Sequence, residues 1–137
     1  MPTRLVQPVT APDAVLPRAH ACLTRWRELV CEVEEGYGWS GPELANDLFC
    51  RTQLAAVWRL LPEKVRTARQ AELEALDERF RAATIPFPGH EQLTGQWWTW
   101  RVPRVLEVEP GLPRHRGWPM GWEMMPFPKP DQVDVVE

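Results

Sequence analysis

The chain has 137 residues, of which 44% are hydrophobic and 26% are charged, and its formal net charge is −3. This size and composition predict one globular domain with a modest core, and they exclude the strongly basic field of a nonspecific nucleic-acid binder. No segment approaches the roughly 18 consecutive apolar residues of a membrane span. Residues 1–17 resemble neither a secretory signal nor a transit peptide, so we expect a cytoplasmic protein.

The N-terminal part is expected to be an extended arm followed by a helix. Residues 1–17 contain four prolines and no hydrophobic period, which predicts the arm. A helix is expected from about Pro17 to Gly36, because apolar residues then recur at helical spacing. This stripe consists of Ala19, Cys22, Leu23, Trp26, Val30 and Val33. Cys22 and Cys31 fall on opposite helix faces, and all three cysteines are expected to be reduced and buried.

Two further helical segments are predicted before residue 84. Ser40 and Glu43 form a capping box ahead of a helix that begins at Pro42 and reaches about Leu61. A bend or a break is expected near Thr52, where its apolar stripe changes phase. A third helix is expected from Pro62 to Ala83. Its apolar stripe is Val65, Ala68, Leu73, Leu76, Phe80 and Ala83, and its charged residues, Asp77, Glu78 and Arg81 among them, are assigned to the solvated face.

The composition changes after Thr84, where nine of the 15 prolines and five of the eight tryptophans occur. A short extended piece is expected between Trp98 and Val108, at a sheet edge because of Pro103. So many tryptophans would be badly exposed in a free tail, so we expect residues 85–137 to form an irregular strap over the helices. The predicted fold is an all-α bundle of three or four helices over residues 18–84, with this strap completing a single domain.

Several runs resemble a family of small, uncharacterised proteins of high-GC bacteria. They are RWRELVCEVEEGY, ELANDLFCR, the pair Leu61 and Pro62, ELEALDERFRAAT and a Trp pair before Arg and Pro. The relatives show a "GY...NDL..R" run and a "LD.RFRAAT" run in the same order. The resemblance covers about 60 to 80 residues. It implies an all-helical core and no known activity, and the residues after Trp100 depart from the pattern.

A polar cluster in the second helix is a candidate site. Asp47 and Arg51 are four residues apart and are expected to pair along one helix face, next to Asn46. The cluster is interpreted either as a structural salt bridge that fixes the helix register or as a polar contact with a partner. The structural interpretation is favoured.

The stretch GQWWTWRVPR offers a second candidate. Trp97, Trp98 and Trp100 are able to form an aromatic platform, with Arg101 or Arg104 holding an anionic group beside it. The favoured alternative is that these tryptophans anchor the strap to the core. If the stretch is extended, Trp98 and Trp100 share one side and Trp97 faces the other.

The end of the first helix is acidic, and its charges have two interpretations. The simpler is that strap arginines complement them within the molecule. The alternative is a surface that mimics an anion and blocks a basic partner, with Tyr37 and Trp39 as aromatic anchors. The glutamates assigned to this surface are Glu32, Glu34 and Glu35.

Enzymatic chemistry has little support in the sequence. The three histidines are isolated, and no metal-ligand spacing, nucleophile motif or phosphate-binding glycine loop is present. We therefore expect no catalytic residues, no cofactor and no metal. The predicted function is a small protein-binding module, with an immunity protein or antitoxin as the specific candidate. The alternative is a small-molecule-binding protein with a Trp-lined pocket. The sequence leaves the oligomeric state open.

Overall fold

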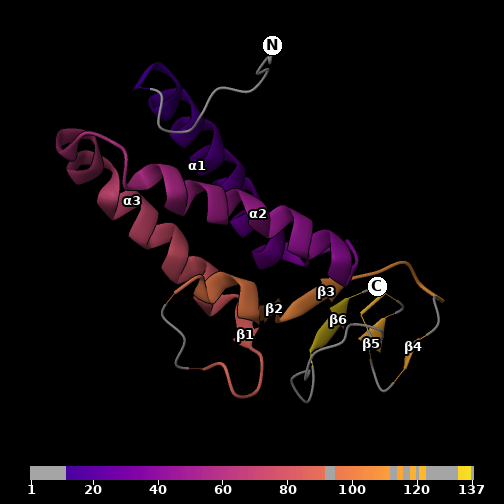
Figure 1. Ribbon diagram of the computed structural model, residues 1–137. Coiled ribbons are helices and arrows are strands. Elements are labelled where there is room, and N and C mark those ends of the chain that lie inside the picture. The colour runs from indigo at the N-terminus through magenta and orange to yellow at the C-terminus, as the bar shows by residue number, and fades with distance from the viewer. Residues whose placement is uncertain are drawn as a thin grey trace, which may run out of the picture.

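The computed structural model describes residues 12–91, 95–111, 114–115, 118–119, 121–122 and 133–136. Most of the described chain belongs to the helices α1 (Pro12–Glu35), α2 (Gly41–Trp58) and α3 (Glu63–Ala82). A 3-10 turn, η1 (Trp97–Trp100), and several short strands follow. The strands lie together beyond the end of the bundle where α1 and α3 finish (Figure 1). The protein is a helical bundle with a small strand-containing C-terminal region, so the expected purely α-helical fold is corrected.

Helix α1 carries the predicted apolar stripe, but it begins earlier than expected. It starts at Pro12 and continues through Pro17. Val15 is 5% exposed and lies four residues before Ala19, so it extends the buried stripe upstream by one turn. Residues 1–11 of the predicted arm lie outside the described residues. The helix ends before Gly36, whose φ of +123° is a conformation that glycine adopts readily.

Helix α2 has the predicted start. Ser40 precedes the helix, and its side-chain oxygen accepts a hydrogen bond from the backbone N–H of Glu43 at 3.4 Å. The helix then continues without interruption to Trp58, so α2 is not broken near Thr52. The change of phase in its apolar stripe has another cause, because α2 packs against both α1 and η1. Its buried surface is therefore wider than one stripe.

Helix α3 is well packed only in its second half. Its buried residues are Leu73, Leu76, Asp77 and Phe80. None of the residues from Glu63 to Glu72 is fully buried, and Ala68, which the sequence assigned to the core, is exposed. The beginning of α3 therefore leaves surface uncovered near the turn that follows α2.

The strands form three pairs among the described residues. β1 (Thr84–Pro86) is antiparallel to β2 (Arg101–Pro103), β3 (Val105–Glu107) is parallel to β6 (Asp134–Val136), and β4 (Arg114–His115) is antiparallel to β5 (Trp118–Pro119). Pro103 does lie in an edge strand, because its sheet has two strands. Tyr37 connects this region to α1: its N–H donates to the Val105 carbonyl at 3.0 Å, and its carbonyl accepts from the Glu107 N–H at 2.9 Å.

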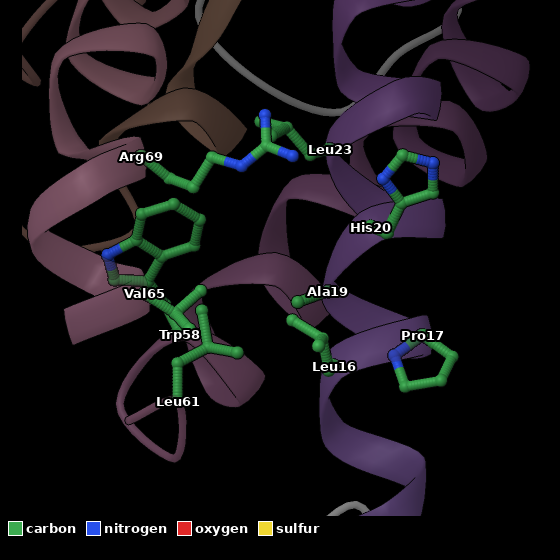
Figure 2. Close-up of a pocket in the computed structure, with 9 residues that line it drawn as sticks. All are labelled: Leu16, Pro17, Ala19, His20, Leu23, Trp58, Leu61, Val65 and Arg69. Carbon is green, nitrogen blue, oxygen red and sulfur yellow. The ribbon is translucent and has the colours of Figure 1, made fainter. Parts of the chain in front are cut away.

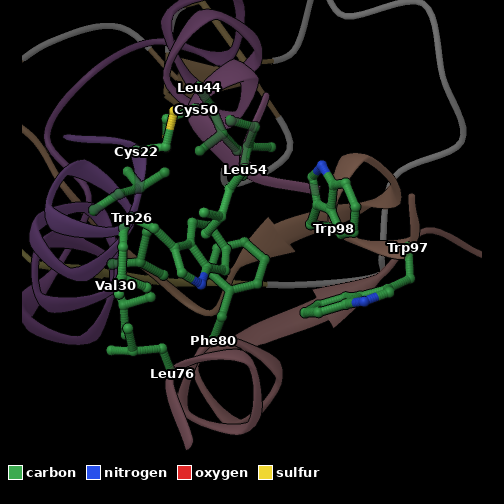
Figure 3. Packing of buried hydrophobic residues seen from close by; sticks show 14 of the residues in the cluster. Cys22, Trp26, Val30, Leu44, Cys50, Leu54, Leu76, Phe80, Trp97 and Trp98 are labelled. Carbon is green, nitrogen blue, oxygen red and sulfur yellow. The ribbon is translucent and has the colours of Figure 1, made fainter. Parts of the chain in front are cut away.

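The core combines side chains of the bundle with tryptophans of the strap (Figure 3). The ring centroids of Trp26 and Phe80 are 4.8 Å apart, and those of Phe80 and Trp97 are 6.0 Å apart. Trp97 and Trp98 are both buried, whereas Trp100 is 39% exposed. Residues 97–100 form a 3-10 turn and not an extended strand, so the condition under which Trp98 and Trp100 were expected to share one side is not met.

Candidate functional site

Tyr37, predicted as an exposed anchor, lies in the core. Its side chain is fully buried, and its hydroxyl donates a hydrogen bond to Asp47 Oδ2 at 2.6 Å. Burial, together with this bond to a carboxylate, raises the pKa of Tyr37. Trp39, two residues later, is 62% exposed. Of the two predicted aromatic anchors, Trp39 alone faces solvent.

Two of the three predicted partner-binding glutamates already have ion-pair partners in the bundle. Glu34 accepts hydrogen bonds from Arg79 Nε at 2.9 Å and Nη2 at 2.7 Å, and these bonds lower the pKa of Glu34. Glu32 lies 3.7 Å from Arg25. Glu35 is exposed and makes no ion pair within the described ranges. The partners of Glu32 and Glu34 are helix arginines and not the strap arginines that the sequence suggested.

The predicted pair between Asp47 and Arg51 does not form. Asp47 lies 3.1 Å from Arg25 Nη2 and accepts the Tyr37 hydroxyl bond. Arg51 instead binds Asp77 of α3, and Asn46 is exposed. The cluster is therefore divided between two networks, one near the end of α1 and one in the core.

The core network is a buried ion pair that connects the three helices. Arg51 donates to Asp77 through Nε at 3.0 Å and Nη2 at 2.8 Å, and the two residues are 6% and 8% exposed. Trp26 Nε1 of α1 donates to Asp77 Oδ1 at 3.1 Å. The Arg51 guanidinium carbon lies 4.3 Å from the Trp98 ring centroid. Every partner is internal, so this network holds the bundle and the strap together and offers no open surface.

Asp77 is the residue of this network that the sequence analysis assigned wrongly, to the solvated face. A signal for its burial exists in the sequence. Leu73, Leu76, Asp77 and Phe80 follow the spacing i, i+3, i+4 and i+7, which is one face of a helix. An aspartate within that face indicates a buried carboxylate with a cationic partner on another element.

The residues predicted to bind a ligand are separated by the structure. Trp97 and Trp98 are in the core, where Trp98 Nε1 donates to Thr52 Oγ1 at 3.0 Å. Arg104 is exposed and donates to the Ala82 carbonyl at 3.0 Å. Trp100, which is exposed, and Arg101, which is partly buried, remain together on the strap. The predicted five-residue platform is thus reduced to this pair.

Trp100 and Arg101 line a small cavity that we call the aromatic groove. Its volume is about 170 Å³. The α2 side of the groove consists of Gly41, Leu44, Ala45 and Leu48, and the strap side of Phe87, Thr99, Trp100, Arg101 and Trp122. The Arg101 guanidinium already donates to Thr84 Oγ1 at 2.7 Å, and burial lowers its pKa. Its charge is therefore engaged within the fold.

Three exposed aromatic residues line the aromatic groove or lie close in sequence to its lining residues. Trp100 stacks on His90, with ring centroids 4.5 Å apart. Phe49, which follows the groove residue Leu48 in α2, is 57% exposed. Trp39 lies just before the start of α2, and its carbonyl accepts a hydrogen bond from Trp122 Nε1 at 3.2 Å. Phe49 is exposed although Leu48 beside it is buried, because adjacent residues of a helix point about 100° apart.

A second cavity, the apolar groove, lies between α1 and the turn that joins α2 to α3 (Figure 2). Its volume is about 360 Å³. One wall includes Leu16, Ala19 and Leu23 of α1, and the other includes Trp58, Leu61 and Val65. The polar side chains in the lining are His20 and Arg69, and Arg69 extends from α3 toward Leu23. No local sequence pattern predicts this groove, because the loose packing of the start of α3 depends on the tertiary fold.

The other features of the chain do not narrow its chemistry. No group of three or more His, Cys, Asp or Glu side chains within the described ranges is arranged to hold a metal ion. No helix in the described part of the chain has the length and apolarity to cross a membrane. Comparison of the chain with known protein families, with curated proteins and with solved structures finds no match. The resemblance proposed from the sequence therefore stays a prediction.

Proposed function

We propose that the protein is a protein-binding module whose contact surface is the aromatic groove and its exposed rim. The observation that carries this proposal is a small concave site whose lining includes the exposed Trp100. Two further exposed aromatic residues, Trp39 and Phe49, lie close in sequence to its lining residues Gly41 and Leu48. Aromatic side chains dominate the binding energy of protein interfaces, where they surround or fill pockets at the centre of the contact.

The volume of the aromatic groove favours a protein over a small molecule. Pockets that enclose small ligands usually measure about 300–1,000 Å³. At about 170 Å³, the groove is below this range and is suited to one inserted side chain. Its apolar lining favours an aliphatic or aromatic side chain of the partner. This argument weighs against the alternative of a Trp-lined ligand pocket at this site.

The partner proposed here differs from the basic partner that the sequence suggested. Tyr37, which was predicted to belong to the surface for that partner, is buried in the core, and Glu34 is bound to Arg79. An acidic contact now depends mainly on Glu35, so recognition through apolar side chains is better supported. The more specific classes of immunity protein and antitoxin stay predictions, as does the cytoplasmic location.

The proposal is tested by capture of partners from extracts of the native cell with the tagged full chain. Phe49→Glu places a charge on the rim without disturbing the core, because Phe49 is 57% exposed. Leu60→Glu is the matched control, since Leu60 is 41% exposed and lies outside the groove. We expect a stoichiometric partner to be retained by the control and lost by Phe49→Glu and by Trp100→Ala. A partner that binds all of these variants equally well would exclude the aromatic groove as the interface.

A further inference from the structure

We infer that the apolar groove is a second binding site, for a small amphiphile with an alkyl chain and an anionic end group, such as a long-chain carboxylate. The site is independent of the aromatic groove and of the protein partner proposed above. Its volume of about 360 Å³ is within the range of small-ligand pockets, which distinguishes it from the aromatic groove.

The walls of the apolar groove suit an alkyl chain. Leu16, Ala19 and Leu23 follow one another along two turns of α1, and Trp58, Leu61 and Val65 face them (Figure 2). Trp58 Nε1 donates to Gln70 Oε1 at 3.1 Å, so the polar atom of the indole is satisfied outside the groove. An alkyl chain that enters between these walls leaves water without requiring any hydrogen bond.

The ionisable side chains that line the groove are basic. They are His20 and Arg69, and no acidic side chain is among the described lining residues. The charge of the lining therefore favours an anionic ligand over a neutral or cationic one.

Arg69 is also incompletely neutralised. Its Nη1 donates to Glu72 Oε1 at 3.0 Å, but Glu72 is shared with Arg27, which binds its other carboxylate oxygen. One carboxylate thus serves two guanidinium groups, and one positive charge remains. Because Arg69 reaches across the groove toward Leu23, that charge lies where the end group of a bound chain would emerge (Figure 2).

The test is isothermal titration of the full chain with dodecanoate below its micellar concentration. Dodecyltrimethylammonium, with the same chain and the opposite charge, and acetate, with the same head group and no chain, are the comparison ligands. We expect one dodecanoate per chain, bound at least tenfold more tightly than the cationic amphiphile, and no detectable binding of acetate. Equal binding of the two amphiphiles, or no binding of dodecanoate, would overturn the inference.

Two variants locate the site. Leu16→Glu places a negative charge on a wall residue that is 53% exposed, so the fold is expected to persist, and it should weaken dodecanoate binding at least tenfold. Arg69→Gln should also weaken it, because it removes the charged side chain that lines the groove, and circular dichroism verifies that each variant is folded. Phe49→Glu, on the aromatic rim, is the control and should bind dodecanoate normally. Unchanged binding by Leu16→Glu, or binding of an acidic amphipathic peptide in place of dodecanoate, would contradict the assignment.

Discussion

At the scale of single residues, the bidentate contact between Arg51 and Asp77 joins α2 to α3 inside the core. It brings a charge from α2 and a charge from α3 out of water, and Trp26 supplies a further donor from α1. Such a pair adds little net stability compared with apolar residues of the same volume, but it strongly penalises arrangements in which one partner is left alone. Its principal effect is to fix how the three helices align.

Asp77→Asn should therefore destabilise the protein more than most single substitutions. It removes the countercharge of a guanidinium that is buried with it, for which the expected loss is about 3–5 kcal/mol of unfolding free energy. Denaturant-induced unfolding measures this loss. The double variant Arg51→Met with Asp77→Leu should recover most of it, because neither charge is then buried. A double variant that is as unstable as the single one would contradict this account.

Tyr37 gives a second prediction at this scale. It is the single tyrosine of the chain, so tyrosinate absorbance reports the ionisation of this residue alone. Its pKa is raised in the folded state by burial and by Asp47, above the value of about 10 in an unfolded chain. The raised pKa means that the neutral Tyr37 side chain stabilises the folded state fully below about pH 10. This stabilisation is lost as the pH rises above that value. Tyrosinate absorbance should accordingly appear only when the protein unfolds in alkali. A normal titration of the folded protein near pH of about 10 would show that the ring is accessible.

At the scale of elements, the boundaries set by local chemistry are the ones that the sequence predicts. Ser40 and Gly36 mark a helix start and a helix end through contacts within a few residues of the chain. The 3-10 turn at Trp97–Trp100 and the burial of Tyr37 are different, because they depend on α2 and on β3, which are distant in sequence. No local pattern distinguishes a tryptophan that faces the core from one that faces solvent in an irregular strap.

The contact between the strap and the start of α2 is tested by glycine substitution. Gly121 has a φ of +94°, its carbonyl accepts the Gly41 N–H at 3.3 Å, and a Cβ there would lie 3.1 Å from Ser40 Cβ. Gly111 has a φ of +83° but no atom within 4 Å of such a Cβ. Both alanine variants should lose about 1–2 kcal/mol from the left-handed backbone, measured by urea unfolding, and Gly121→Ala should lose more. Equal losses would mean that Ser40 yields without cost.

At the scale of the whole molecule, the strap and the bundle share one core. Trp97 and Trp98 pack among the bundle residues, so the helices are not independent of the strap. The sequence predicts this general arrangement from the number of tryptophans after residue 84, because they would otherwise be exposed. It does not predict which of them enter the core, or that the start of α3 stays open.

Substitution of two neighbouring tryptophans should separate these roles. Trp98→Ala should reduce the unfolding free energy by about 3–5 kcal/mol, as expected for a buried indole, and the helical signal should still be lost in one transition. Trp100→Ala should lose no more than about 1 kcal/mol, because that ring is partly exposed. Thermal unfolding followed by circular dichroism makes the comparison. A helical signal that survives Trp98→Ala at the original melting temperature would show that the strap is dispensable.

Helix α2 begins at one groove and ends at the other: Gly41 lines the aromatic groove, and Trp58 lines the apolar groove. At a rise of about 1.5 Å per residue, these positions are about 25 Å apart, so occupants of the two grooves do not collide. Any influence of one occupant on the affinity for the other has to pass through the packing of α2 and must be reciprocal. Titration of each site with the other saturated would measure that coupling directly, and for two rigid, independent sites the affinities would be unchanged.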